Sequence, residues 1–210
     1  MISSIILIIS FATAVIGMVC YKRLTMPFKI LSVYLVYLFV DNVVNQYVNA
    51  VYKSNVPVLH IETIANYIFF SLIYYYLLKN KYLKKAILVS IVLVTLFFFI
   101  NALWLQPYYK VFPSNSMLIN EIIFVIFSLL LFKQLLLYPL QIKITKQGVF
   151  WFNTAILLFS TTMFFNFALI NYYFLHNTQS PVLSYFWHFL DISFNILLGI
   201  AILTDKKQIT

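Results

Sequence analysis

Long apolar segments alternate with short polar ones along the whole chain. A membrane-spanning helix needs about 20 predominantly apolar residues. Seven segments reach that length: residues 2–20, 28–51, 58–78, 85–105, 116–138, 149–173 and 182–203. The connections between them are short, so neighbouring helices should pack antiparallel. The pattern predicts an all-α polytopic membrane protein, a seven-transmembrane-helix bundle that forms a single transmembrane domain over residues 1–210.

The composition excludes an ordinary soluble domain. Hydrophobic residues make up 63% of the chain and charged residues 9%, whereas soluble domains carry roughly 25% charged residues. The mean hydropathy is +0.95. A single cysteine, Cys20, excludes an internal disulfide and a metal site built on a cysteine pair.

Helix-breaking residues avoid the predicted spans. All six prolines fall at or beside a predicted connection. Only three glycines occur, and no GxxxG pair is present. We therefore expect continuous helices that pack mainly through large side chains, rather than the broken helices and inverted repeats common in transporters.

Basic residues predict the orientation in the membrane. Alternate connections are rich in them, with Lys22, Arg23 and Lys29 in the first, Lys79, Lys81, Lys84 and Lys85 in the third, Lys143 and Lys146 in the fifth, and Lys206 and Lys207 in the tail. The connections between these hold only Lys53 and Lys110. Because Lys and Arg concentrate in cytoplasmic loops, the N-terminus is predicted outside and the C-terminus in the cytoplasm.

The net charge of +9 does not indicate nucleic-acid binding, because the basic residues form small groups between apolar runs and no long basic tail is present. Anionic membrane lipids are the expected partners of these groups. The predicted location is the cell membrane, as a multi-pass protein.

Four of the five acidic residues lie inside predicted spans, namely Asp41, Glu62, Glu121 and Asp191. From a helical rise of about 1.5 Å per residue, all four are expected in the outer half of the membrane. Amide and imidazole side chains lie one helical turn from these acids. The sequence therefore predicts an outward-facing polar pocket whose ligand-binding candidates are Asp41, Asn45, Glu62, Asn66, Glu121, His188, Asp191 and Asn195.

These carboxylates have no basic partner in the outer halves of the spans. In a low-dielectric setting they cannot all stay ionised at low cost, so a proton or a cation must join them. His188, Asp191 and Asp41 are candidate ligands of a divalent metal ion, which is the candidate cofactor. A metal-activated water would allow hydrolysis, but the sequence identifies no catalytic residue.

The helical pair His188 and Asp191 gives the chain a layout that resembles the seven-span membrane hydrolases, which include the alkaline ceramidases and the adiponectin-receptor group. Those proteins use a helical HxxxH pair, whereas position 192 here is Ile. In its richness in Ile, Phe, Tyr, Asn and Lys, the whole chain resembles small uncharacterised seven-span bacterial membrane proteins. That resemblance implies a bacterial plasma membrane.

We expect a non-enzymatic role, as a receptor-like signalling sensor or an accessory binding module that acts through a partner protein in the membrane or cytoplasm. The alternatives are an intramembrane metal-dependent lipid hydrolase, an ion or proton pathway, and a structural subunit. A retinal protein is disfavoured because residues 182–203 contain no lysine.

Overall fold

The computed structural model describes residues 2–138, 143–175 and 181–205. These residues form helices and no strand, and seven of the helices are long and apolar enough to cross a membrane. They are α1 (Ile2–Cys20), α2 (Met26–Tyr52), α3 (Val56–Leu77), α4 (Lys81–Ile100), α5 (Ser114–Leu137), α6 (Gly148–Leu175) and α7 (Pro181–Thr204). Short helical turns lie at Tyr21–Arg23 (η1), Asn101–Leu105 (η2) and Ile144–Lys146 (η3). Each predicted span is therefore a helix, and the predicted tail lysines Lys206 and Lys207 lie outside the described residues.

The start of α4 differs from its predicted position more than the start of any other span does. The helix begins at Lys81, four residues before the predicted start at position 85. The Asn80 side chain caps it by accepting hydrogen bonds from the backbone N–H groups of Tyr82 and Leu83. Lys84 stays near the surface with its ammonium group 5.2 Å from the centre of the Tyr75 ring. Lysines are good helix formers whose charged ends can reach the interface, so a basic residue does not mark the helix boundary.

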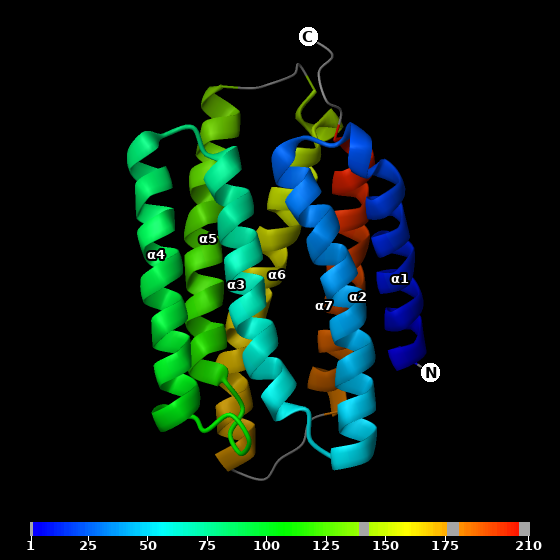
Figure 1. Cartoon of the computed structure of the whole chain (residues 1–210), viewed down its shortest axis with the longest axis vertical. Helices are drawn as coiled ribbons and strands as arrows, with labels where there is room; N and C mark the ends of the chain where they lie inside the picture. The colour runs from blue at the N-terminus through cyan, green and yellow to red at the C-terminus, as the bar shows by residue number, and fades with distance from the viewer. Residues whose placement is uncertain (1, 139–142, 176–180, 206–210) are drawn as a thin grey trace.

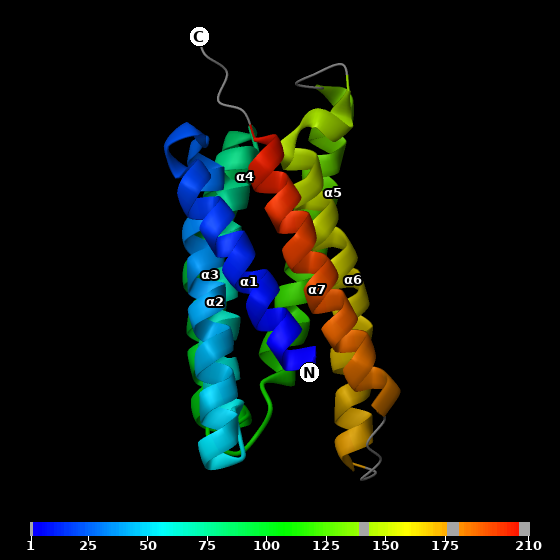
Figure 2. The same ribbon diagram turned by 90° about the vertical axis from the view of Figure 1, so that its right-hand side faces the viewer.

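The helices form one bundle in which α1 lies between α2 and α7 (Figure 1, Figure 2). Helices adjacent in the chain pack together, apart from α4 and α5, and α5 instead packs against α3 and α6. We call the end where α1 joins α2 and α3 joins α4 the upper end, and the end where α2 joins α3 and α4 joins α5 the lower end, as drawn in Figure 1. The start of α1 lies above the lower end of the bundle, and α2 and α7 diverge below it (Figure 2).

Glycines mark the closest helix contacts. A Cβ atom added at each would meet a neighbouring helix, at 2.9 Å from Ser32 Oγ for Gly17, 2.5 Å from the Ala201 carbonyl oxygen for Gly148, and 3.2 Å from Thr13 Cγ2 for Gly199. The prediction that the helices pack mainly through large side chains is therefore incomplete. The α1–α2, α6–α7 and α1–α7 contacts depend on a small residue that lets the backbones approach.

A buried polar network holds the connection between α4 and α5. Asn101, at the start of η2, donates hydrogen bonds to Gln106 Oε1 at 3.0 Å and to Ser116 Oγ at 2.9 Å. Gln106 in turn donates to Ser114 Oγ at 2.8 Å. All four side chains are buried. Because buried polar groups must be paired, this network fixes how the first turns of α5 sit relative to α4.

The end of α7 is fastened to the start of α2 at the upper end. The backbone N–H of Thr25, the N-cap residue of α2, donates a hydrogen bond of 2.8 Å to Asp205 Oδ2. The Thr25 hydroxyl donates to the same carboxylate at 3.1 Å. Burial raises the pKa of Asp205 above its ordinary value, while the Thr25 hydrogen bonds and the nearby charge of Arg23 act in the opposite direction.

Replacing Asp205 by alanine should destabilise the bundle by about 1–2 kcal/mol, because a helix N-terminal N–H group loses its acceptor. Unfolding of the purified protein in detergent measures the change. The variant Asp205→Asn keeps an acceptor oxygen for the Thr25 N–H and should lose clearly less stability. Equal losses in the two variants would contradict this role of the carboxylate.

Candidate functional site

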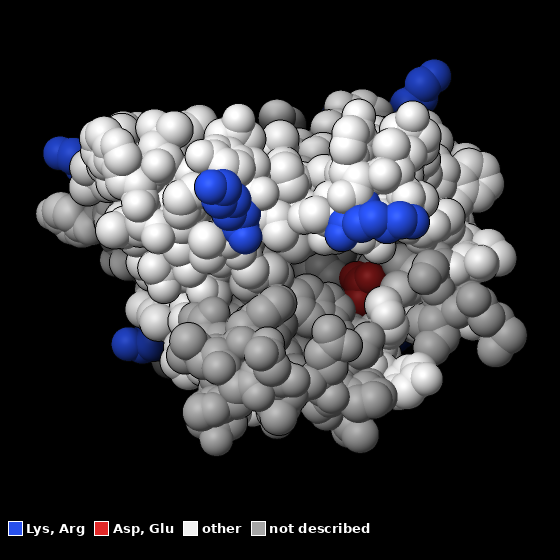
Figure 3. Space-filling model, turned by 90° about the horizontal axis from the view of Figure 1, so that it is seen from below, with Lys and Arg blue, Asp and Glu red and all other residues white. Residues whose placement is uncertain are grey.

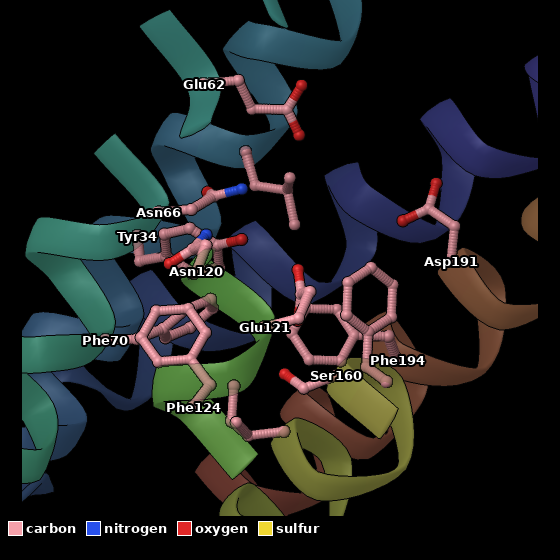
Figure 4. A pocket seen from close by; sticks show the side chains of 13 residues that line it. Tyr34, Glu62, Asn66, Phe70, Asn120, Glu121, Phe124, Ser160, Asp191 and Phe194 are labelled. Carbon is pink, nitrogen blue, oxygen red and sulfur yellow. The ribbon is translucent and has the colours of Figure 1, made fainter. Parts of the chain in front are cut away.

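A small polar cavity lies between α2, α3, α5, α6 and α7 (Figure 4). Its volume is about 40 Å³, enough for a few water molecules or an ion and far below the roughly 300–1,000 Å³ typical of sites for organic ligands. Tyr34 and apolar side chains complete its wall. We call it the acidic cavity, after the polar side chains that line it: Glu62, Asn66, Asn120, Glu121, Ser160 and Asp191.

The structure brings four of the predicted ligand-binding residues to this cavity. Glu62 and Asn66 reach it from α3, Glu121 from α5 and Asp191 from α7. None of the described residues that line it is a lysine, arginine or histidine. Three carboxyl groups that are distant in the sequence therefore share one cavity without a basic side chain in its wall.

Asp41 lies next to the cavity rather than in its wall. It is 7% exposed, and it accepts hydrogen bonds from Asn45 Nδ2 at 2.8 Å and from the Tyr37 hydroxyl at 3.3 Å, both on its own helix. Asn45 also donates to Glu62 on α3 and accepts from Asn55 at 3.2 Å. Asn45 thus connects two of the acids and holds the lower ends of α2 and α3 together.

The remaining predicted residues, His188 and Asn195, do not line the cavity. Asn195 is buried and donates hydrogen bonds to the backbone oxygen of Asp191 at 3.0 Å and to its Oδ1 at 3.3 Å. Asn195 therefore orients Asp191 from one turn along α7.

The predicted metal ligands His188, Asp191 and Asp41 are not brought together. Within residues 2–138, 143–175 and 181–205, no three His, Cys, Asp or Glu side chains are grouped so that they could hold a metal ion. The prediction placed His188 and Asp191 on one helix face, but Asp41 is held on α2 by Tyr37 and Asn45. A metal site at His188, Asp191 and Asp41 therefore stays a prediction from the sequence, which the grouping of the described side chains does not support.

The acids fall into two electrostatic groups. Glu62 interacts electrostatically with both Asp41 and Asp191, so Glu62 repels each of them when the groups are ionised. Glu121 instead accepts a hydrogen bond from Ser160 on α6. In Figure 4 the Glu121 carboxylate lies near the centre of the view, between Asn120 and Ser160, while Asp191 lies apart on α7.

Seen from the lower end, an acidic side chain is visible at the bottom of a hollow with a basic side chain at its rim (Figure 3).

Two cavity residues, Asn120 and Ser160, were not predicted from the sequence. Asn120 precedes Glu121 directly, and neighbouring residues on a helix point about 100° apart, so helical spacing does not place both in one site. Ser160 stands in a run with Thr161 and Thr162, where its hydroxyl gives no distinguishing signal. Only the packing of α6 against α5 shows that both residues face the cavity.

Aromatic rings form the upper wall of the cavity. Phe70 on α3 lies at ring-centre distances of 5.4 Å from Phe124 on α5 and 6.1 Å from Phe194 on α7. The Phe194 ring is in turn 4.4 Å from that of Phe159 on α6. All four rings line the cavity, so these rings from α3, α5, α6 and α7, which we call the phenyl layer, close its upper side.

A second buried polar cluster lies one helical turn beyond this layer. The Tyr74 hydroxyl donates a hydrogen bond of 2.9 Å to Asn153 Oδ1, and it lies 2.6 Å from Ser128 Oγ. Asn153 Nδ2 donates to the backbone oxygen of Ser128 at 2.9 Å. Since Tyr74 follows Phe70 by four residues and Ser128 follows Phe124 by four, α3 and α5 each carry the same order of polar, aromatic and polar side chains on one face.

Comparison of the chain with protein-family models, curated proteins and solved structures gives no match. No function is therefore carried over from another protein, and the acidic cavity is the feature from which a function is inferred.

Proposed function

We propose that this protein is a membrane-embedded sensor or accessory binding module that takes up a proton or a small cation in the acidic cavity. One observation carries the proposal: Glu62, Glu121 and Asp191 line a cavity of about 40 Å³ together with amide and hydroxyl groups and without a basic side chain. Ionised carboxyl groups so placed are costly in a low-dielectric environment, and a bound positive charge lowers that cost.

The response would pass through helix packing. The cavity lies where five helices meet. The repulsion of Glu62 by Asp41 acts between α3 and α2, and its repulsion by Asp191 acts between α3 and α7. Neutralising these groups favours closer approach of α7 to α2 and α3 at the lower end. Because the connections between the described helices are short, we propose that a partner protein in the membrane or cytoplasm receives the signal.

We further propose that the lower end faces the cell exterior and that the membrane is a bacterial plasma membrane. The connections at the upper end are rich in lysine, whereas Lys53 and Lys110 are the basic residues of the two described connections at the lower end. This asymmetry follows the positive-inside tendency. The acidic cavity would then open toward the outside, and the basic upper end would contact anionic lipid head groups.

Wild-type protein should become more stable as the pH falls from neutral to mildly acidic, since protonation removes repulsion among the buried acids. Asp191 interacts electrostatically with Glu62 from α3 and Tyr34 from α2, it shares the cavity wall with Glu121 from α5, and Asp41 and His188 are the further titratable groups on α2 and on its own helix. Thermal unfolding in detergent measures the effect, with a rise in Tm of about 2–4 °C for each kcal/mol of repulsion relieved.

The variant Asp191→Asn should show a flatter dependence of Tm on pH and a higher Tm at neutral pH. Asp205→Asn makes the same chemical change outside the cavity and should leave most of the pH dependence in place. An unchanged pH dependence in Asp191→Asn would count against a proton-responsive cavity.

A proton or ion pathway is the second candidate function. The cluster of Tyr74, Ser128 and Asn153 supports it, because these polar groups continue the line of the cavity toward the upper end. The phenyl layer opposes it, because an apolar constriction excludes water. Flux measurements on the protein in liposomes decide between a closed binding module and a pathway. No observation on the described residues favours the lipid-hydrolase alternative.

A further inference from the structure

Unpaired acceptor oxygens gather in the acidic cavity. Glu121 Oε2, Asn120 Oδ1 and Asn66 Oδ1 are buried atoms without a hydrogen-bond partner. Glu121 and Asn120 are only 5% and 4% exposed. All three residues line the same cavity, with Glu121 directed toward its centre (Figure 4). A buried acceptor without a donor costs about 1–3 kcal/mol, so three such oxygens on residues that line one cavity point to a bound group.

We propose, building on the proposed function, that the deep part of the acidic cavity is a binding site for a small monovalent cation of the Na⁺ type. Its ligands are Glu121 Oε2 and the amide oxygens of Asn120 and Asn66. Asp41, Glu62 and Asp191 are not ligands in this proposal. Their negative charges attract the cation to the cavity.

A cation accounts for the unpaired oxygens better than a proton or water does. A proton on Glu121 supplies one donor, which leaves at least one of the two amide oxygens unpaired. Water molecules in the cavity can donate hydrogen bonds to these oxygens, but they leave the charge of an ionised Glu121 uncompensated in a low-dielectric environment. A single cation coordinates all three oxygens and neutralises the carboxylate.

The charge and type of the ligands select the ion. Every candidate ligand is an oxygen, and oxygen ligands suit hard cations rather than transition metals. Glu121 is hydrogen-bonded to Ser160 and stands apart from the repulsion that involves Glu62. One positive charge is therefore enough to neutralise the deep site. Divalent Mg²⁺ gives up its water reluctantly, and Ca²⁺ requires about 6–8 oxygen ligands. A volume of about 40 Å³ excludes organic cations.

The test is the thermal stability of the full chain in a non-ionic detergent at constant ionic strength, with NaCl exchanged against N-methylglucamine chloride. Above the dissociation constant, each tenfold rise in Na⁺ should raise the Tm of wild-type protein by about 3–6 °C. Glu121→Gln and Asn120→Ala should reduce this rise strongly. Asn166→Ala is the matched control, since Asn166 is 3% exposed and also has an unpaired Oδ1, but it does not line the cavity.

The outcomes separate this site from the proposed function. A Na⁺ response that is lost in Asn120→Ala and kept in Asn166→Ala supports the site, even if Glu121→Gln does not fold. A pH response without a Na⁺ response overturns the cation site and leaves the proton-responsive module in place. Stabilisation by CaCl₂ but not by NaCl overturns the monovalent assignment. Stability that responds to neither pH nor any cation overturns both proposals.

Discussion

Phe70→Ala should have the largest effect on both stability and permeability. The Phe70 ring is 4% exposed and packs against Tyr34, Phe124, Phe152 and Phe194, with ring centres 4.5–6.1 Å apart. We expect a loss of about 3 kcal/mol, the lower end of the range for Phe to Ala in soluble cores, because lipid rather than water surrounds the helices. The vacated space would join the acidic cavity to the cluster of Tyr74, Ser128 and Asn153. A pH-sensitive dye inside liposomes should then report a proton leak that wild-type protein does not show.

Phe98→Ala is the control for this experiment. Phe98 is 1% exposed and packs on Tyr67, but it does not line the cavity. It should lose a comparable stability without a leak. If wild-type protein already conducts protons at the rate of the Phe70 variant, the phenyl layer is not a barrier and the pathway function is favoured.

Gly148→Ala should destabilise the protein by about 2 kcal/mol, although alanine is the better helix former. The added Cβ would lie 2.5 Å from the carbonyl oxygen of Ala201 and 3.1 Å from the backbone nitrogen of Asp205. Both are backbone atoms of the last turn of α7, where the Asp205 N–H donates to the Ala201 oxygen at 3.1 Å. Relief of the clash therefore requires α6 and α7 to separate. Unfolding of purified protein in detergent measures the loss.

Gly199→Ala is the control for Gly148→Ala, because it adds the same methyl group at a helix contact where a side chain rather than a backbone must move. Its Cβ would meet only the Thr13 methyl group, at 3.2 Å, and alanine favours the helix by about 1 kcal/mol. We expect a stability equal to or slightly above that of wild type. A loss as large as that of Gly148→Ala would show that backbone contact is not what distinguishes the two sites.

The acidic site was only partly predictable because spacing on one helix does not determine which helices meet. Helical periodicity correctly placed Asn66 one turn from Glu62, and both line the cavity. It gave no reason to include Ser160, whose position depends on how α6 packs against α5. It also gave no sign that Asp41 lies next to the cavity rather than in its wall, with hydrogen bonds from Tyr37 and Asn45 on its own helix.

The sequence by itself determined the number, the approximate bounds and the helical state of the spans, since an apolar run of sufficient length must satisfy its backbone hydrogen bonds internally in lipid. It also determined that the halves of the spans that carry the buried acids contain no lysine or arginine. The tertiary structure alone decided which acids share a cavity, which ones their neighbours already pair, and that phenyl rings separate two polar clusters. These features depend on how each helix is rotated and which helices are in contact. Small residues such as Gly148 determine some of these contacts, because they let two backbones approach closely. Hydrophobic periodicity does not encode the contacts in a chain whose helices are apolar on nearly every face.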